Sequence, residues 1–254
     1  MSMPINSARA SIAHARDLIA DLEAQLARFK RSQNAVQVVH HEPILKQQIY
    51  RIRFFGPEFP QKASNIAKDA VSNLRDSLDH IMYAAAVAKG GGTPKKTGFP
   101  FGSDADAVRH RLTRELADNP RELHQLLLDT KPHEGGNHAI WSLNQLRNPN
   151  THRFIVPVGS AAVAQATVTE GVILGPSVFY NRWHSATNEV EYMRLGSGST
   201  IQLSVSAHIQ VQFADVEAVA GRPVIPTLLT MASEVDRIVT SIEDECRRLG
   251  FAIS

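Results

Sequence analysis

Both ends of this 254-residue chain carry the same narrow apolar pattern, which constrains the fold more than any other feature. Apolar residues alternate at four and three positions, in Ala8, Ile12, Ala15, Ile19, Leu22, Leu26 and Phe29, and again in Leu228, Ala232, Val235, Val239, Ile242, Cys246 and Leu249. This spacing predicts two long helices, each with an apolar seam that needs a helical partner. The two helices are expected to pair with each other, within one chain or across a homodimer.

A third long helix is predicted over Ser64 to Lys89, because its apolar residues recur on one face. Gly90-Gly91-Gly92 is expected to end it. Pro226 is expected to begin the last helix and Gly250 to end it. Shorter helices are predicted over Asp104 to Ala117, Pro120 to Asp129 and Asn137 to Arg147.

Two regions carry β-strand patterns instead. Val36 to His40 and Gln47 to Phe54 predict a hairpin that turns through His41-Glu42-Pro43. Further strands are predicted over Phe154 to Val158, Ala164 to Leu174, Val190 to Leu195 and Ile201 to Phe213.

The expected fold class is therefore α+β, a helical bundle with an inserted, mainly antiparallel β-sheet. The bundle is expected at about residues 1–33, 64–148 and 226–250, and the β elements at about 35–55 and 153–213. No linker is long enough to separate domains, so residues 1–254 are expected to form a single compact domain.

Composition excludes some classes of function. The 27 basic and 25 acidic residues give a net charge of only +2, which is not the global field of a non-specific DNA binder. The longest apolar run, Met82 to Ala88, is too short to span a membrane. Cys246 is the only cysteine, which fits a reducing cytoplasm. No histidine pair has metal-ligand spacing with a carboxylate beside it, so neither a metal nor a cofactor is expected.

Two six-residue segments carry candidate chemistry: Arg75 to His80 and Arg147 to His152, each beginning with an arginine and ending with a histidine. An arginine and a histidine held together are what metal-free RNA cleavage requires. In the first segment, Asp76 and His80 are four residues apart on one helical face, so Asp76 is expected to accept a hydrogen bond from the imidazole. Arg75 lies about 140° round the helix from His80, and its nearest partner is Asp79.

The second segment is broken by Pro149, which ends any helix there. Asn148, Asn150 and Thr151 are good capping and turn residues, which accounts for them without catalysis. The alternative is that the segment contacts phosphate or bases near the first site, with Trp141 and Arg153 supplying a stacking surface and charge.

The order of these segments resembles a family of uncharacterised bacterial and prophage proteins. The resemblance rests on Asn73-Leu74-Arg75-Asp76-Ser77-Leu78-Asp79-His80, on Phe99-Pro100-Phe101, and on Asn148-Pro149-Asn150-Thr151-His152-Arg153. It covers roughly residues 64–160 and implies no known activity. This chain has Asn150-Thr151 where the family has Asp-Lys.

More distantly, both Arg-to-His segments resemble the HEPN superfamily of helical ribonucleases, many of which are toxins or defence factors. This resemblance implies a metal-independent endoribonuclease that leaves a 2′,3′-cyclic phosphate, built as a homodimer with its site at the subunit interface and sometimes held by a protein inhibitor. His80 would be the general acid or base, Arg75 would stabilise the phosphorane, and Asp76 would orient the imidazole. The substrate contacts would come from Asn73, Arg147, Asn148, His152 and Arg153.

A structural interpretation of the same residues stays open. Arg75 and Asp79 can form an ion pair, and Asp76 and His80 can form a hydrogen bond that secures packing. The protein would then be a non-enzymatic dimeric binding protein whose sheet offers the contact surface. The two interpretations differ in whether RNA is cut when excess EDTA is present.

Overall fold

The structure is a computed structural model that describes residues 5–90, 92–147, 154–170, 179–196 and 200–252. The chain divides into two compact units. The helical unit consists of Met1–Ala24, Gln61–Phe154 and Phe213–Ser254, and the β unit consists of Gln25–Pro60 and Ile155–Gln212. The α+β class is confirmed, whereas the single compact domain over residues 1–254 stays a prediction.

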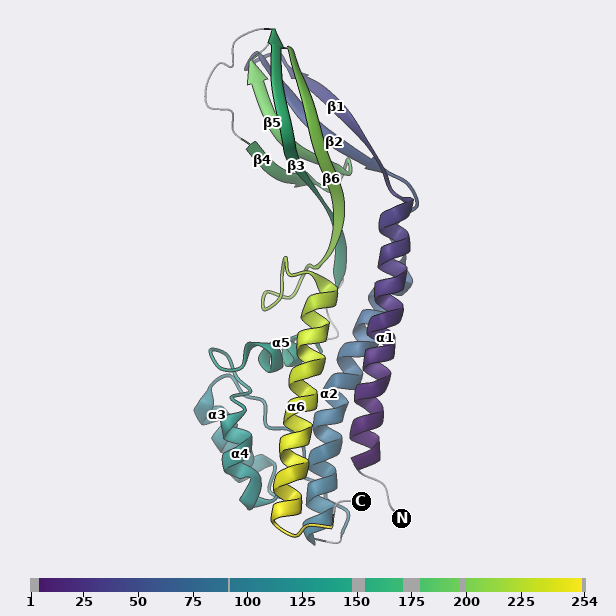
Figure 1. Cartoon of the computed structure of the whole chain (residues 1–254). Coiled ribbons are helices and arrows are strands. Elements are labelled where there is room, and N and C mark those ends of the chain that lie inside the picture. The colour runs from purple at the N-terminus through teal and green to yellow at the C-terminus, as the bar shows by residue number, and fades with distance from the viewer. Residues whose placement is uncertain (1–4, 91, 148–153, 171–178, 197–199, 253–254) are drawn as a thin grey trace. The chain divides into compact units, whose positions relative to one another are not determined.

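Three long helices form the bundle of the helical unit (Figure 1). They are α1 (Ile5–Ser32), α2 (Gln61–Gly90) and α6 (Val224–Arg248). The predicted seams of both terminal helices are buried, from Ala8 to Phe29 in α1 and from Leu228 to Cys246 in α6. Since this burial occurs within one chain, the seams need no second copy of the protein to cover them.

Arg9 joins the two terminal helices. Its Nε donates to Oε1 of Glu243 over 3.0 Å, and its Nη2 donates to Oε2 of Glu243 over 2.8 Å. Its Nη1 pairs with Asp236. The hydrogen bond to buried Glu243 is the largest cause that raises the pKa of Arg9. Of the two arrangements that the sequence left open, the structure therefore shows pairing within the chain.

The C-terminal end of α6 is capped as predicted, whereas its first residue differs from the prediction. Gly250 has a φ of 76°, and the N–H of Phe251 donates to the carbonyl of Cys246 over 2.9 Å, as in a Schellman cap. The helix begins at Val224, with Pro223 as its N-cap, rather than at the predicted Pro226. A proline in the first turn removes no intrahelical hydrogen bond, so the helix can start earlier.

The shorter helices of the helical unit follow the predicted segments. They are α3 (Ala105–His110), which continues into the π-helical turn η1 (Arg111–Glu115), the 3₁₀ turn η2 (Arg121–Leu123), α4 (His124–Asp129) and α5 (His138–Leu146). Asp104 caps α3 by accepting the N–H of Ala107 over 2.8 Å. In the described chain, no helix is long and apolar enough to cross a membrane.

The β unit contains a four-stranded antiparallel sheet in the order β1-β2-β5-β4. Its strands are β1 (Asn34–Glu42), β2 (Gln47–Phe55), β4 (Phe179–His184) and β5 (Glu189–Gly196). A separate two-stranded sheet pairs β3 (Ile155–Glu170) with β6 (Thr200–Phe213). The predicted β1–β2 hairpin is confirmed. Apart from Phe154, one strand, β3, covers the described parts of the two predicted segments Phe154 to Val158 and Ala164 to Leu174, whose residues 171–174 lie outside the described residues. Strand β4 was not predicted.

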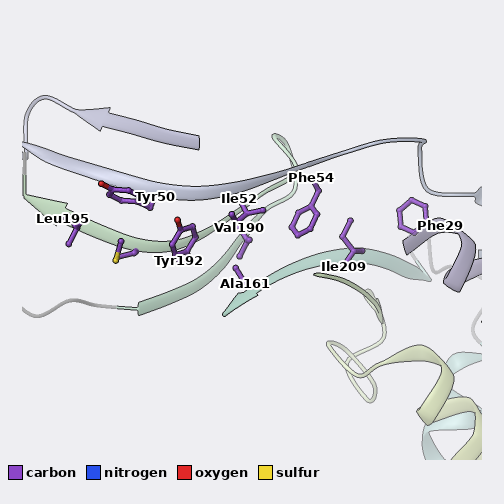
Figure 2. Close-up of a cluster of buried hydrophobic side chains, with 10 residues drawn as sticks. Phe29, Tyr50, Ile52, Phe54, Ala161, Val190, Tyr192, Leu195 and Ile209 are labelled. Carbon is purple, nitrogen blue, oxygen red and sulfur yellow. The ribbon is translucent and has the colours of Figure 1, made fainter. Parts of the chain in front are cut away.

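Apolar side chains from both sheets form the core of the β unit (Figure 2). From β2 the cluster takes Tyr50, Ile52 and Phe54, which alternate along the strand. A bulge between Tyr50 and Arg51 shifts the register against β5, so the consecutive residues Tyr192 and Met193 are both buried. The residues that alternate with this cluster lie on the opposite face of the four-stranded sheet.

Candidate functional site

The first Arg-to-His segment lies in the middle of α2, and its arginine is buried. Arg75 is 7% exposed. Its Nη1 lies 2.5 Å from Oδ2 of Asp79, as the spacing of four residues predicts. Its guanidinium carbon lies 4.2 Å from the centre of the Phe101 ring. Burial lowers the pKa of Arg75, and the charge of Asp79 offsets part of that effect.

Asp79 connects this arginine to the Phe99-Pro100-Phe101 segment. Its Oδ1 accepts the backbone N–H of Phe99 over 2.8 Å. Phe99 and Phe101 are 1% and 2% exposed, and their ring centres lie 5.0 Å apart. We call Arg75, Asp79, Phe99 and Phe101 the Arg75 clamp. It fastens the segment that follows α2 back onto that helix.

His80 contacts a different element, the N-terminal part of α1. Its Nδ1 lies 3.0 Å from the hydroxyl oxygen of Ser7 and 3.4 Å from that of Ser11. The imidazole is half-buried. No hydrogen bond or ion pair joins Asp76 to His80 in the described chain, so the expected hydrogen bond to the carboxylate is replaced by contacts with the serines of α1. Sequence spacing missed these contacts because Ser7 lies 73 residues away.

Asn73, another predicted site residue of α2, makes its hydrogen bond within the same helix. The side-chain amide of Asn73 donates to the carbonyl of Asp69 over 2.8 Å. Arg75 and His80 thus lie in one helix but contact different partners, the Phe99 to Phe101 segment and α1 respectively. Within one chain, the structure does not bring this arginine and this histidine into one site.

Only the start of the second segment can be located. Arg147 is the exposed C-cap residue of α5, and its positive charge contributes to lowering the pKa of Arg75. The two segments therefore approach each other at their arginines. Asn148, His152 and Arg153 lie outside the described residues. Trp141, predicted as a stacking surface, packs edge-on against His138 with ring centres 6.0 Å apart.

A pocket that the sequence did not indicate lies beside α5 and the start of α6. It has a volume of about 580 Å³, and His138, Arg222, Pro223, Pro226 and Met231 are among its lining residues. Nη2 of Arg222 lies 3.4 Å from Nε2 of His138. Burial and this neighbouring charge lower the pKa of His138. Since 84 residues separate the pair, no local pattern reveals it.

A second cluster missed by the sequence lies in the β unit, where two glutamates of β5 are fully buried beneath arginines. Glu189 and Glu191 are 0% exposed. Arg51 contacts both carboxylates, at 3.1 Å each. Nη2 of Arg53 lies 2.6 Å from Oε1 of Glu189. Nε of Arg194 lies 2.6 Å from Oε1 of Glu191.

Histidines complete this cluster on both sides. Nε2 of His40 lies 3.2 Å from Glu189, and Nε2 of His184 lies 3.3 Å from Glu191. Burial raises the pKa of each carboxyl, but the hydrogen bonds from the arginines outweigh it and hold both pKa values below their usual range. Both glutamates therefore stay ionised at neutral pH. Among the described residues, no three His, Cys, Asp or Glu side chains are grouped so that they could hold a metal ion.

Comparison with known proteins adds no assignment. Neither the models of known families, nor the curated proteins, nor the solved structures give a match to this chain. The two resemblances stated from the sequence thus stay predictions, and the function has to be argued from the geometry above.

Proposed function

We propose that this protein is a non-enzymatic binding protein, in which the helical unit serves as a scaffold and the β unit carries the contact surface. The observation that carries the proposal is the burial of Arg75 in the Arg75 clamp. A catalytic arginine has to reach a phosphate that enters from solvent, whereas the Arg75 side chain is only 7% exposed and is held by the ion pair with Asp79 and by the Phe101 ring.

The cost of moving this arginine supports the same conclusion. Nε of Arg75 is buried without a hydrogen-bond partner in the described chain, so the ring of Phe101 is its compensating contact. Withdrawing the guanidinium towards solvent would leave Asp79 with the Phe99 N–H alone. Because Asp79 is half-buried, losing this pair costs about 1 to 3 kcal/mol, which is still a sizeable fraction of the stability of a domain.

The proposal includes a homodimer in the cytoplasm. The helical seams are covered within the chain, so the dimer contact is assigned to β1 at the end of the four-stranded sheet. Val36 and Val39 of this strand are 46% and 39% exposed. An end strand with exposed apolar side chains is suited to pairing with a second copy of itself.

A metal-independent ribonuclease of the HEPN type, with a toxin or defence role and a protein inhibitor, is the second candidate. One observation favours it: Nδ1 of half-buried His80 is held by Ser7, whereas its Nε2 has no hydrogen-bond partner among the described residues. An imidazole fixed at one nitrogen and free at the other has the arrangement of a general acid or base. Arg147 rather than buried Arg75 would then supply the exposed positive charge.

One experiment separates the two candidates. End-labelled single-stranded RNA is incubated with the wild-type protein and with His80→Ala, in excess EDTA and in added magnesium ion. The binding-protein proposal expects intact RNA in all samples. Products with 2′,3′-cyclic phosphate ends that appear in EDTA and vanish in His80→Ala would overturn it. Cleavage that requires the metal ion would overturn both candidates as stated.

A further inference from the structure

The face of the four-stranded sheet opposite its apolar core carries a cluster of arginines. Residues that alternate with the buried positions lie on this face, and the strand register brings them side by side. We call it the basic face, and its charged and histidine residues are His40, Glu42, Arg51, Arg53, Arg182, His184, Glu189, Glu191 and Arg194. The cluster of arginines and histidines around Glu189 and Glu191 forms the centre of this face.

The charges of the basic face do not cancel. Four arginines stand against three glutamates, which leaves an excess of one positive charge when both histidines are neutral. Glu189 and Glu191 are fully buried, whereas the side chains of Arg53 and Arg194 are 47% and 29% exposed. The carboxylates therefore lie beneath the guanidinium groups and hold them in position, and the surface presents arginine to solvent.

Arg182 has no partner within this arrangement. It is exposed, and its Cα pairs with that of Glu191 across the β4–β5 ladder. No hydrogen bond or ion pair connects its side chain to any described residue, because Arg51 and Arg194 already occupy the Glu191 carboxylate. A guanidinium that lies on a positively charged face and has no carboxylate of its own is available to an anionic ligand.

An aromatic pocket lies at the end of the sheet where β2 ends, lined on one side by Arg53 and Phe55 of the basic face and on the other by Phe54 and Trp183 of the core face. It has a volume of about 450 Å³, and its lining includes Arg53, Phe55, Glu58, Trp183 and Asn188. Phe55 lies two residues after Arg53 on the same strand, so both side chains lie on the basic face, and Phe55 is 51% exposed. The pocket thus combines an exposed ring, a guanidinium, and a carboxylate and an amide that can hydrogen-bond a heterocycle.

We infer that this face binds single-stranded nucleic acid, with a nucleobase in the aromatic pocket against Phe55 and the neighbouring phosphates on Arg53 and Arg182. Non-specific single-strand sites combine a positive surface that follows the backbone with aromatic rings on which bases stack. The proximity of Phe55 and Arg53 supplies both parts within one strand. An acidic peptide would use the arginines but would leave the ring and the pocket empty.

This inference rests on the proposed function, since it names the ligand of the binding protein. The two are tested separately: RNA cleavage overturns the non-enzymatic function, whereas the binding measurement below concerns only the basic face. The probe is a fluorescein-labelled oligouridylate of about twelve nucleotides, a length within the range that such surfaces contact. Fluorescence anisotropy gives its dissociation constant at about 50 mM and about 200 mM salt.

Two variants on the basic face and one matched control are compared with the wild-type protein. Phe55→Ala removes the ring and is expected to weaken binding roughly 5- to 100-fold, with an unchanged salt dependence. Arg182→Ala removes one phosphate contact and is expected to lower the slope of log Kd against log salt by about 0.7. Arg109→Ala makes the same charge change at an exposed position of α3 and is expected to bind like wild type. Melting temperatures establish that all three are folded.

Three results would overturn the inferred nucleic-acid site. Equal losses in Arg109→Ala and Arg182→Ala would show attraction by net charge alone and would overturn the site. An unchanged dissociation constant in both Phe55→Ala and Arg182→Ala would overturn it as well. Absence of binding at low salt would overturn the inference while the non-enzymatic function stands. A single-stranded DNA of the same length is expected to bind too, because no contact named here involves the 2′-hydroxyl.

Discussion

The guanidinium carbon of Arg75 lies 4.2 Å from the centre of the Phe101 ring, and both side chains are buried. The planar cation stacks on the aromatic face while Nη1 pairs with Asp79. Together these contacts connect α2 to a segment that begins nine residues after that helix ends. The arginine and aspartate of the first motif therefore act in the fold of the helical unit.

Replacing the ring should destabilise the protein measurably. Phe101→Leu removes the stacking contact and leaves part of a filled volume empty, so we expect a loss of roughly 2 kcal/mol in the free energy of unfolding. Urea denaturation followed by circular dichroism measures it. Phe55→Leu is the control, because that ring is 51% exposed and its loss should change stability by less than about 0.5 kcal/mol. Similar values for the two variants would contradict the clamp.

The seam of α6 offers a second test. Ile242 is 0% exposed, so Ile242→Asp places an unpaired charge in the bundle and should cost several kcal/mol or prevent folding. Leu229 lies on the same helix and is 47% exposed, so Leu229→Asp should change stability by less than about 0.5 kcal/mol. Thermal unfolding of both variants is the measurement. A small effect of Ile242→Asp would mean that the seam is not buried.

The buried glutamates predict an acid-sensitive β unit. Because the pKa values of Glu189 and Glu191 are lowered in the folded state, their contribution to stability is present above the unfolded value of about 4.3 and is lost as the pH falls through the lower folded values. Glu189→Gln should therefore cost roughly 3 kcal/mol at pH 7, and its difference from wild type should shrink in acid.

Denaturation curves at a series of pH values check this prediction. Glu58→Gln serves as the control, since Glu58 is exposed and pairs with no cation in the described chain. Its stability should follow that of the wild-type protein at every pH. A Glu189→Gln variant whose difference from wild type is the same at neutral and acid pH would show that the carboxylate does not titrate with unfolding.

The contact between Ser7 and His80 predicts a modest coupling between α1 and α2. A single hydrogen bond of this kind contributes about 1 kcal/mol, so Ser7→Ala and His80→Ala should each lose about that amount. The double variant should lose less than the sum of the two, by about 0.5 to 1 kcal/mol. Additive losses would mean that the His80 imidazole does not contact Ser7. They would also remove the observation that favours the ribonuclease.

Sequence periodicity predicted the bundle because each seam is a local pattern. The alternating spacing of four and three residues alone assigns Ile12 and Ile242 to the apolar seams, and both are buried. The pairing of Arg75 with Asp79 was likewise predicted from a spacing of four residues. The burial of Arg75 was not predicted, because the residues that cover it, Phe99 and Phe101, come from a later segment. The return of that segment to α2 depends on tertiary contacts.

Other parts of the molecule have no local signal. Arg222 and His138 meet across 84 residues, and the serines that hold His80 lie in another helix. Strand β4 was missed because Arg182 and His184 place polar groups where an apolar alternation would be sought. The polar side chains of Arg182 and His184 fit a strand only because the buried glutamates of β5 lie opposite them in the sheet.

Arg75 provides the most direct test of the central claim, that the motif stabilises the fold and does not cleave RNA. Arg75→Met, Asp79→Asn and the double variant are compared with wild type by urea denaturation, and the same samples are incubated with single-stranded RNA. We predict that each single variant loses about 1 to 3 kcal/mol, that the double variant loses about 0.5 to 1 kcal/mol less than the sum, and that no sample cuts RNA. An Arg75→Met variant with wild-type stability, together with RNA cleavage that the wild type performs and this variant lacks, would contradict the account.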